Sequence, residues 1–244
     1  MSSPVSRVFI TRATGLLGSR LAAARASQWP GEPNGMLVLF AASLSGLAIV
    51  SLWKFQHRLG PTFVALFTKE GPLEDLTYML ELIGAALCAV AVWRFSRGKS
   101  LFRPTRPARW MFASLALALF AVGMEEINWG QTLLGFGTPE AWKEINHQQE
   151  TSLHNLLGRN ALEWGARAIG VAVALGVIAL VFLGMKFPDS LPGEIAPQPA
   201  LVPLALCIAF ASLKQHSEVV ELLVAMFFAF YAYRLWALSR PPRP

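Results

Sequence analysis

Long apolar runs separated by short polar connections are the feature that most constrains this chain of 244 residues. A helix needs about 20 residues to cross the hydrocarbon core of a bilayer, and six runs approach that length. They are Met36–Trp53, Leu76–Trp93, Trp110–Met124, Ala161–Gly184, Ala200–Leu213 and Val219–Trp236. The third and fifth runs are short, so their helices must tilt, borrow flanking residues or re-enter the membrane.

Composition supports the same class of protein. Hydrophobic residues make up 54% of the chain and charged residues 15%, whereas an ordinary soluble domain is about 25% charged. We predict an all-α fold, a polytopic integral membrane helical bundle with about six transmembrane helices. Residues 1–35 are expected to form a basic tail, 36–236 a single transmembrane domain and 237–244 a second tail.

Basic residues fall mainly on one side of the predicted membrane. The N-terminal tail, the second and fourth connections and the C-terminal tail hold most of the 21 Lys and Arg residues. Arg234 is counted with the C-terminal tail, and Arg167 stays inside the fourth span. The positive-inside rule therefore predicts that both termini are cytoplasmic, and it accounts for the net charge of +6 without a nucleic-acid partner.

Acidic residues gather on the opposite, extracytoplasmic side together with histidines. The set expected at one mouth of the bundle is Glu81, Glu125, Glu126, His147, Glu150, His154, Glu163, His216, Glu218 and Glu221. Glu81 lies about one turn inside the second span, and Glu221 has a similar place in the last span. A carboxylate at that depth is costly unless it holds a proton, a hydrogen bond or a cation. The alternative is a structural role, with acidic residues simply remaining where basic ones are excluded.

The third span leads outward into two adjacent carboxylates, Glu125 and Glu126. Two such groups at a membrane boundary repel each other, so we expect one to hold a proton or both to share a cation. Neighbouring residues of a helix point about 100° apart, so only one of the two can face the bundle centre. The alternative is a solvated pair among the lipid headgroups.

A polar helix is predicted after the third span, over residues 139–157. Thr138 is expected to cap it and Pro139 to take its first position. Because it is too polar to span, we expect an amphipathic helix at the extracytoplasmic surface. One of its faces carries residues with the spacing to bind a divalent cation of the Zn²⁺ or Mn²⁺ type: His147, Glu150 and His154. A hydrogen-bonded network without metal and a merely solvated face stay open as alternatives.

The N-terminal segment carries a fragment of a nucleotide-binding pattern. Residues 8–19 resemble the start of an extended short-chain dehydrogenase, but Arg12 stands where the first glycine of the motif belongs. Too little chain follows for a βαβ unit before the first span. We therefore expect no nucleotide and assign no cofactor-binding residues; a basic segment lying on anionic lipid accounts for this stretch.

Two motifs lie before and within the predicted polar helix: Glu-Glu-Ile-Asn-Trp-Gly-Gln at residues 125–131 and Asn-His-Gln-Gln-Glu-Thr-Ser-Leu-His-Asn at residues 146–155. The pair resembles a group of uncharacterised bacterial multi-pass membrane proteins. In that group Glu-Glu-Ile-Ser-Trp-Gly-Gln precedes Asn-x-Gln-x-Glu-x-Asn-Leu-His-Asn, so Asn128 stands where serine is usual and Ser152 where asparagine is usual. The resemblance implies a shared functional unit in a bacterial cytoplasmic (inner) membrane, and it implies no particular reaction.

The leading hypothesis is a membrane-embedded hydrolase or transferase that acts on a lipid or lipid-linked substrate, with a divalent metal as candidate cofactor. The candidate catalytic carboxylates are Glu81, Glu125, Glu126 and Glu221. The candidate substrate-orienting residues are Gln131, Asn146 and Asn155. One alternative is a non-catalytic subunit of a larger membrane complex, with protein partners. Another is a proton- or cation-coupled transporter, against which the apolar inner halves of the spans count.

Overall fold

A computed structural model describes residues 33–67, 71–98, 100, 102–144, 159–214 and 217–241. Within these ranges the chain forms helices joined by turns and loops, and no strand. The six apolar runs lie in α2 (Pro33–Leu59), α4 (Pro72–Ser96), α5 (Arg106–Glu126), α8 (Arg159–Lys186), α10 (Val202–Leu213) and α11 (Ser217–Leu238). Shorter pieces connect them: α3 (Pro61–Leu66), η1 (Asn128–Gly130), α6 (Gln131–Leu134), α7 (Glu140–Lys143), α9 (Leu191–Ile195) and η3 (Pro199–Leu201). The all-α prediction is confirmed.

The number of spans is confirmed only in part. Four stretches in the described part of the chain are long and apolar enough to cross a membrane: Pro72–Ser96, Arg106–Glu126, Arg167–Lys186 and Glu218–Leu238. The fifth predicted run forms a shorter apolar helix over Pro199–Leu213, in which η3 adds a turn to α10 as a flanking extension. Neither α2 nor α10 is among these four candidate spans, so a count of six spans is not established. The N-terminal tail lies outside the described residues up to position 32.

Two helices begin with start signals that the sequence carries. In α4, Pro72 takes a first-turn position and acidic residues follow it, where they interact favourably with the helix dipole. In α5, Thr105 is the N-cap, and its Oγ1 accepts a hydrogen bond from the amide of Ala108 at 3.5 Å. Glu194 Oε2 in turn accepts from the Thr105 amide at 2.9 Å and from its hydroxyl at 2.7 Å, so α9 is tied to the start of α5.

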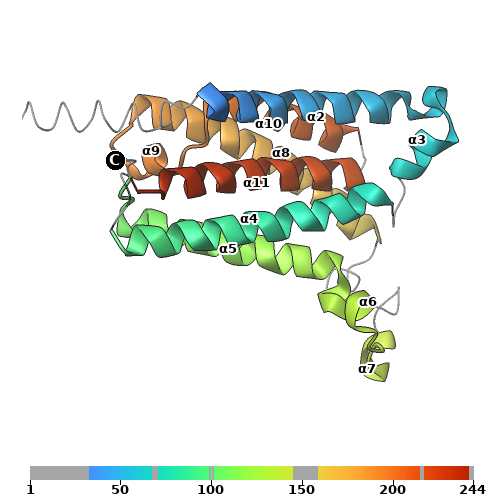
Figure 1. Cartoon of the computed structure of the whole chain (residues 1–244). Coiled ribbons are helices and arrows are strands. Elements are labelled where there is room, and N and C mark those ends of the chain that lie inside the picture. The colour runs from blue at the N-terminus through green and yellow to red at the C-terminus, as the bar shows by residue number, and fades with distance from the viewer. Residues whose placement is uncertain are drawn as a thin grey trace, which may run out of the picture.

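Helix α11 is the centre of the bundle (Figure 1). It packs against α4 on one side and against α8, α10 and α2 on the other, while α5 packs on the far side of α4. In its most apolar stretch 67% of the residues are buried, whereas the values for the other three candidate spans are 28% to 33%. Most residues in the apolar stretches of α4, α5 and α8 are therefore not buried inside the bundle.

Glycines allow the helices to approach closely where they cross, as is common between membrane helices. A Cβ added at Gly84 of α4 would lie 3.5 Å from the Ala229 Cα of α11. A Cβ added at Gly170 of α8 would overlap Ser212 Oγ of α10 and lie 2.9 Å from Val220 Cγ1 of α11. Space therefore requires glycine at position 170, whereas at position 84 the backbones of α4 and α11 lie within ordinary van der Waals contact of an added Cβ.

The two ends of the bundle differ in charge. We name the end where α4 and α11 begin and α5 ends the carboxylate end, because it carries Glu74, Glu81, Glu126, Glu218 and Glu221. We name the opposite end, where α5 begins and α8 and α11 end, the basic end, because it carries Arg94, Arg97, Arg106, Arg109, Lys186 and Arg240. The carboxylate end lies beside α3 and α6, and the basic end beside α9 (Figure 1).

At the basic end, the C-terminal end of α9 is hydrogen-bonded to α11. The Tyr231 hydroxyl donates to the Ile195 carbonyl at 2.6 Å, and Arg234 Nη1 donates to the Ala196 carbonyl at 2.6 Å. Counting Arg234 with the C-terminal tail is therefore wrong: it lies inside α11 and is 5% exposed. The physical reason is that Ala196 sits beyond a helix end and needs a donor for its carbonyl, which this arginine supplies.

Candidate functional site

Glutamates from three helices interact with one another at the carboxylate end. Glu81 comes from α4, Glu126 from the last turn of α5 and Glu221 from the second turn of α11. The carboxyl groups lie close enough to interact electrostatically, Glu81 with Glu126, and Glu221 with both. Glu74 and Glu218 add to the field at Glu221. We call Glu81, Glu126 and Glu221 the glutamate triad.

Glu81 is the most buried member of the triad, with 5% of its surface exposed. Its Oε2 is buried and has no hydrogen-bond partner among the residues that the structure describes. Gly123 of α5 makes this position tight, since a Cβ added there would lie 3.3 Å from Glu81 Cβ. Holding an ionised carboxylate in such a place is costly without a proton, a cation or a donor group.

The two adjacent carboxylates at the end of α5 have different neighbours. Glu126 interacts with Glu81 and Glu221, whereas Glu125 accepts a hydrogen bond from the indole Nε1 of Trp129. This divergence is the one that a 100° step along a helix produces. Both groups are half-buried. Their partners distinguish them, and of this pair Glu126 is the one that joins the triad.

The motif after α5 is a strained turn. Asn128 and Trp129 have φ values of 50° and 56°, in the left-handed region, and Gly130 follows with φ of 83°. Asparagine and glycine adopt this conformation at little cost, but a tryptophan does so only where its surroundings enforce it. The hydrogen bond from Trp129 to Glu125 is one such constraint. The turn redirects the chain away from the bundle into α6 and α7 (Figure 1).

The polar helix predicted over residues 139–157 begins differently from the expectation. The described helix α7 covers Glu140–Lys143, and its N-cap is Pro139 without a side-chain hydrogen bond. Thr138 is therefore not the cap. The residue is 6% exposed, and its hydroxyl accepts a hydrogen bond from Gln131 Nε2 at 2.8 Å. Gln131, a candidate substrate-orienting residue, is thus held by Thr138, which sequence reasoning had given another role.

Several candidate residues fall outside the described part of the chain. These are the proposed metal ligands His147, Glu150 and His154, the candidate orienting residues Asn146 and Asn155, and His216. Glu163 lies in α8, but its side chain is also outside what is described. In the described part, no group of three or more His, Cys, Asp or Glu residues is placed to hold a metal ion. The metal hypothesis therefore stays a prediction about residues 145–158.

Sequence reasoning missed two features of this end: the left-handed turn at Asn128 and Trp129, and the bond between Gln131 and Thr138. The pattern Asn-Trp-Gly contains a usable signal, because Asn and Gly close together mark turns. The bond between Gln131 and Thr138 had no signal, since it depends on how the loop folds back after α6.

No family model matches the chain, and no curated protein or solved structure matches it either. The resemblance of residues 125–155 to bacterial multi-pass membrane proteins therefore stays a prediction. The candidate functional site is therefore the glutamate triad with its surroundings.

Proposed function

We propose that this protein is an integral membrane enzyme, a hydrolase or transferase, that acts on a lipid or lipid-linked substrate at its carboxylate end. The observation that carries the proposal is the glutamate triad, in which carboxyl groups of three separate helices interact at one end of the bundle. Close carboxyl groups cannot all be ionised at once, so one accepts a proton while another donates one. General acid–base chemistry needs that division of roles.

In this proposal Glu126 is the general base, because it is half-exposed and so within reach of water or a substrate hydroxyl. Glu81 and Glu221 hold the proton that the leaving group takes, because they lie deeper in the helices. Glu125 fixes the turn through Trp129, and Gln131, Asn146 and Asn155 orient the substrate. Water or a hydroxyl then attacks the substrate as it loses its proton to Glu126.

The setting proposed for this enzyme is a bacterial cytoplasmic membrane, with both termini in the cytoplasm. The charge asymmetry supports this setting, since the basic end carries Arg and Lys residues that the positive-inside rule assigns to the cytoplasm. The carboxylate end then faces the outer leaflet. A lipid substrate reaches it from the side, along helices whose outer faces are exposed and apolar.

Transport is the less favoured function. A proton or cation path needs polar groups that continue from the triad through the bundle. Toward the basic end, the buried polar groups described on α11 are Tyr231 and Arg234, and both donate to backbone carbonyls at the end of α9. A catalytic site confined to one end fits this arrangement better.

Lipid conversion by the purified protein tests the proposal. The protein is reconstituted into vesicles that contain phosphatidylethanolamine, phosphatidylglycerol, cardiolipin and a polyprenyl phosphate, and every lipid is followed by mass spectrometry. We expect one lipid to be consumed and its hydrolysis or transfer product to accumulate beyond the amount of protein. A folded protein that leaves all these lipids unchanged, with and without added Zn²⁺ or Mn²⁺, would speak against an enzyme of this class.

Metal content is a separate prediction. If His147, Glu150 and His154 hold a divalent ion beside the triad, elemental analysis of the detergent-purified protein will find near-stoichiometric zinc or manganese. We expect that metal to be lost when all three residues are replaced by alanine. A matched variant, Glu140→Gln in α7, should retain it, since Glu140 is paired with Lys143 at 2.7 Å. Equal metal in all three proteins would remove these ligands from the proposal.

A further inference from the structure

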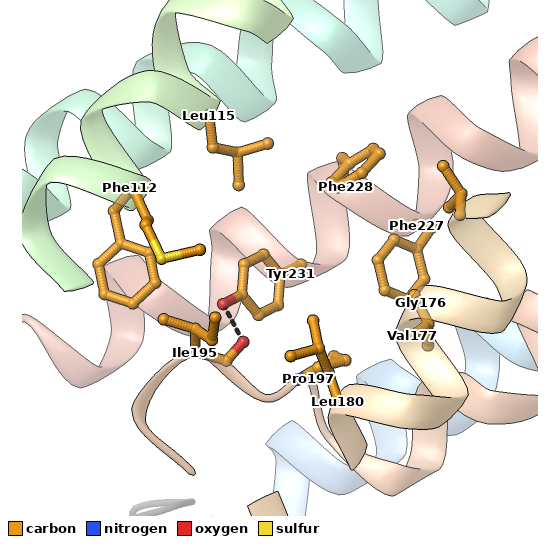
Figure 2. Close-up of a pocket in the computed structure, with 12 residues that line it drawn as sticks. Phe112, Leu115, Gly176, Val177, Leu180, Ile195, Pro197, Phe227, Phe228 and Tyr231 are labelled. Atoms are coloured by element: carbon orange, nitrogen blue, oxygen red, sulfur yellow. Dashed lines mark hydrogen bonds between the residues drawn. The ribbon is translucent and has the colours of Figure 1, made fainter. Parts of the chain in front are cut away.

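An apolar cavity of about 290 Å³ opens between α5 and α8. Figure 2 shows side chains of α5, α8 and α11, of the end of α9 and of the segment after it facing a common space. We call it the α5–α8 groove, and its lining includes Phe112, Leu115, Gly176, Leu180, Phe227 and Tyr231. The groove exists because α5 packs on α4 while α8 packs on α10 and α11, so that α5 and α8 stand on either side of an opening.

The described side chains that line the groove offer an occupant no free hydrogen-bonding group. Among its described lining residues, Tyr231 alone carries a hydroxyl, and that hydroxyl already donates to the Ile195 carbonyl at 2.6 Å (Figure 2). Every other lining side chain is hydrocarbon, aromatic or thioether, apart from a glycine that has none. An occupant of this groove is therefore apolar where it touches the protein.

The position of the groove restricts the source of that occupant. Its walls belong to three of the helices that are apolar enough to cross a membrane, so lipid chains are the medium around it. Its volume is close to the lower bound of about 300 Å³ for pockets that hold small molecules. The occupant that fits is a flexible hydrocarbon chain that enters sideways from the bilayer.

Charge at the basic end indicates the headgroup. Arg106 and Arg109 lie in the first turn of α5 and Lys186 ends α8, so both walls of the groove lead to cations. Arg109 lies one turn before Phe112, and its Nε is buried without a hydrogen-bond partner among the described residues. The acidic residue nearest the start of α5 is Glu194, whose carboxylate is engaged by Thr105.

We propose that the α5–α8 groove binds one hydrocarbon chain of an anionic phospholipid, whose phosphate lies at the basic end beside Arg109. Cationic side chains at a membrane surface attract anionic headgroups, and the groove adds a place for the chain. The site goes beyond the proposed function, because Leu115 lies roughly 16 Å along α5 from Glu126 and the triad. The bound lipid chain fills the space that α5 and α8 leave between them.

Gly176 provides the variant that tests this. It lines the groove, and a Cβ added there would meet no atom within 4 Å, so a larger side chain would extend into the groove. Gly165, three turns earlier in α8, also has open space around its Cβ position but does not line the groove. Gly176→Phe and Gly165→Phe are therefore the same substitution in the same helix, inside and outside the groove.

The probe is phosphatidylglycerol with a photoactivatable diazirine near the end of one acyl chain, in vesicles of phosphatidylethanolamine and phosphatidylglycerol. After irradiation, labelled residues of the full chain are mapped by mass spectrometry. We expect label on the groove-lining stretches of α5, α8 and α11, reduced severalfold by Gly176→Phe and unchanged by Gly165→Phe. A phosphatidylcholine probe should label these stretches less, and Arg109→Gln should remove that preference.

Two results would overturn the inference. One is groove labelling that is absent in the wild type, or equal in the wild type and in a folded Gly176→Phe protein. The other is protection of the groove by a second copy of the chain, seen as a dimer that loses its lipid label. If Gly176→Phe fails to fold, competition between labelled and unlabelled phosphatidylglycerol in the wild type gives the same answer. Lipid conversion is scored separately, so either site can fail alone.

Discussion

Replacing Glu126 by glutamine is expected to lower the rate of lipid conversion by at least about 100-fold, the usual size of a general-base contribution. Glutamine keeps the shape of the side chain but cannot take up a proton. Glu81→Gln and Glu221→Gln should have losses of similar size, because the three carboxyl groups interact as one cluster. The measurement is the initial rate of product formation in vesicles, with equal amounts of folded protein.

Glu140→Gln is the matched control for this series. Glu140 lies in α7, is exposed and forms an ion pair with Lys143 at 2.7 Å, outside the triad. Exposed pairs of this kind contribute about 0–1 kcal/mol, so both stability and rate should stay close to those of the wild type. If Glu126→Gln kept full activity, Glu126 would not be the base, and the role assigned to it would be wrong.

The second large effect is on stability. Gly170→Leu is expected to destabilise the bundle by about 1–3 kcal/mol or more, because the new side chain must enter packed space. Its Cβ would overlap Ser212 Oγ, and Ser212 is fully buried with its hydroxyl bound to the Ile208 carbonyl at 2.8 Å. Ser212 cannot move aside without disturbing the contact of α8 with α10. Thermal unfolding in detergent, followed by circular dichroism, measures the loss.

Gly165→Leu is the control for that substitution. It lies in the same helix, gains the same helix propensity, and has no atom within 4 Å of its Cβ position. It should be as stable as the wild type or slightly more stable. Equal melting temperatures for Gly170→Leu and Gly165→Leu would mean that α8 does not approach α10 as closely as described.

Much of the helical architecture was predictable from sequence, for a simple reason. Long apolar runs can only be helices if they cross a membrane, because every backbone hydrogen bond must then be made within the segment. All six runs are helical, but four are long and apolar enough to be candidate spans. The fifth run is short because its apolar sequence covers only Ala200–Leu213, and its helix, with η3 included, covers Pro199–Leu213. Hydropathy predicts the length and polarity of each helix. It does not predict which helix lies at the centre of the bundle.

The carboxylate end was partly predictable as well. Placing Glu81 and Glu221 near the start of outward-to-inward helices, and Glu126 at the end of a helix running the other way, needs only topology. The packing of α4 between α5 and α11 is a tertiary fact, and it is what brings these groups within electrostatic range. Arg234 was misplaced because a charged residue near a helix end looks like tail, whereas here a free carbonyl binds it.

The α5–α8 groove had no sequence signal. Its lining residues are apolar, as are most residues of these helices, and nothing in their spacing separates a groove from a packed contact. The groove arises from two helices that pack on different partners. Local patterns cannot report such a gap, since it depends on the arrangement of the whole bundle.

The most direct test of the central claim, that Glu81, Glu126 and Glu221 form one site, is the rate of lipid conversion by the triple glutamine variant. Residues that act as a unit give losses that are far from additive. We predict that the triple variant is no slower than the slowest single variant, within a few-fold. A loss equal to the product of the three single losses would show that the carboxylates act independently, and would contradict a shared site.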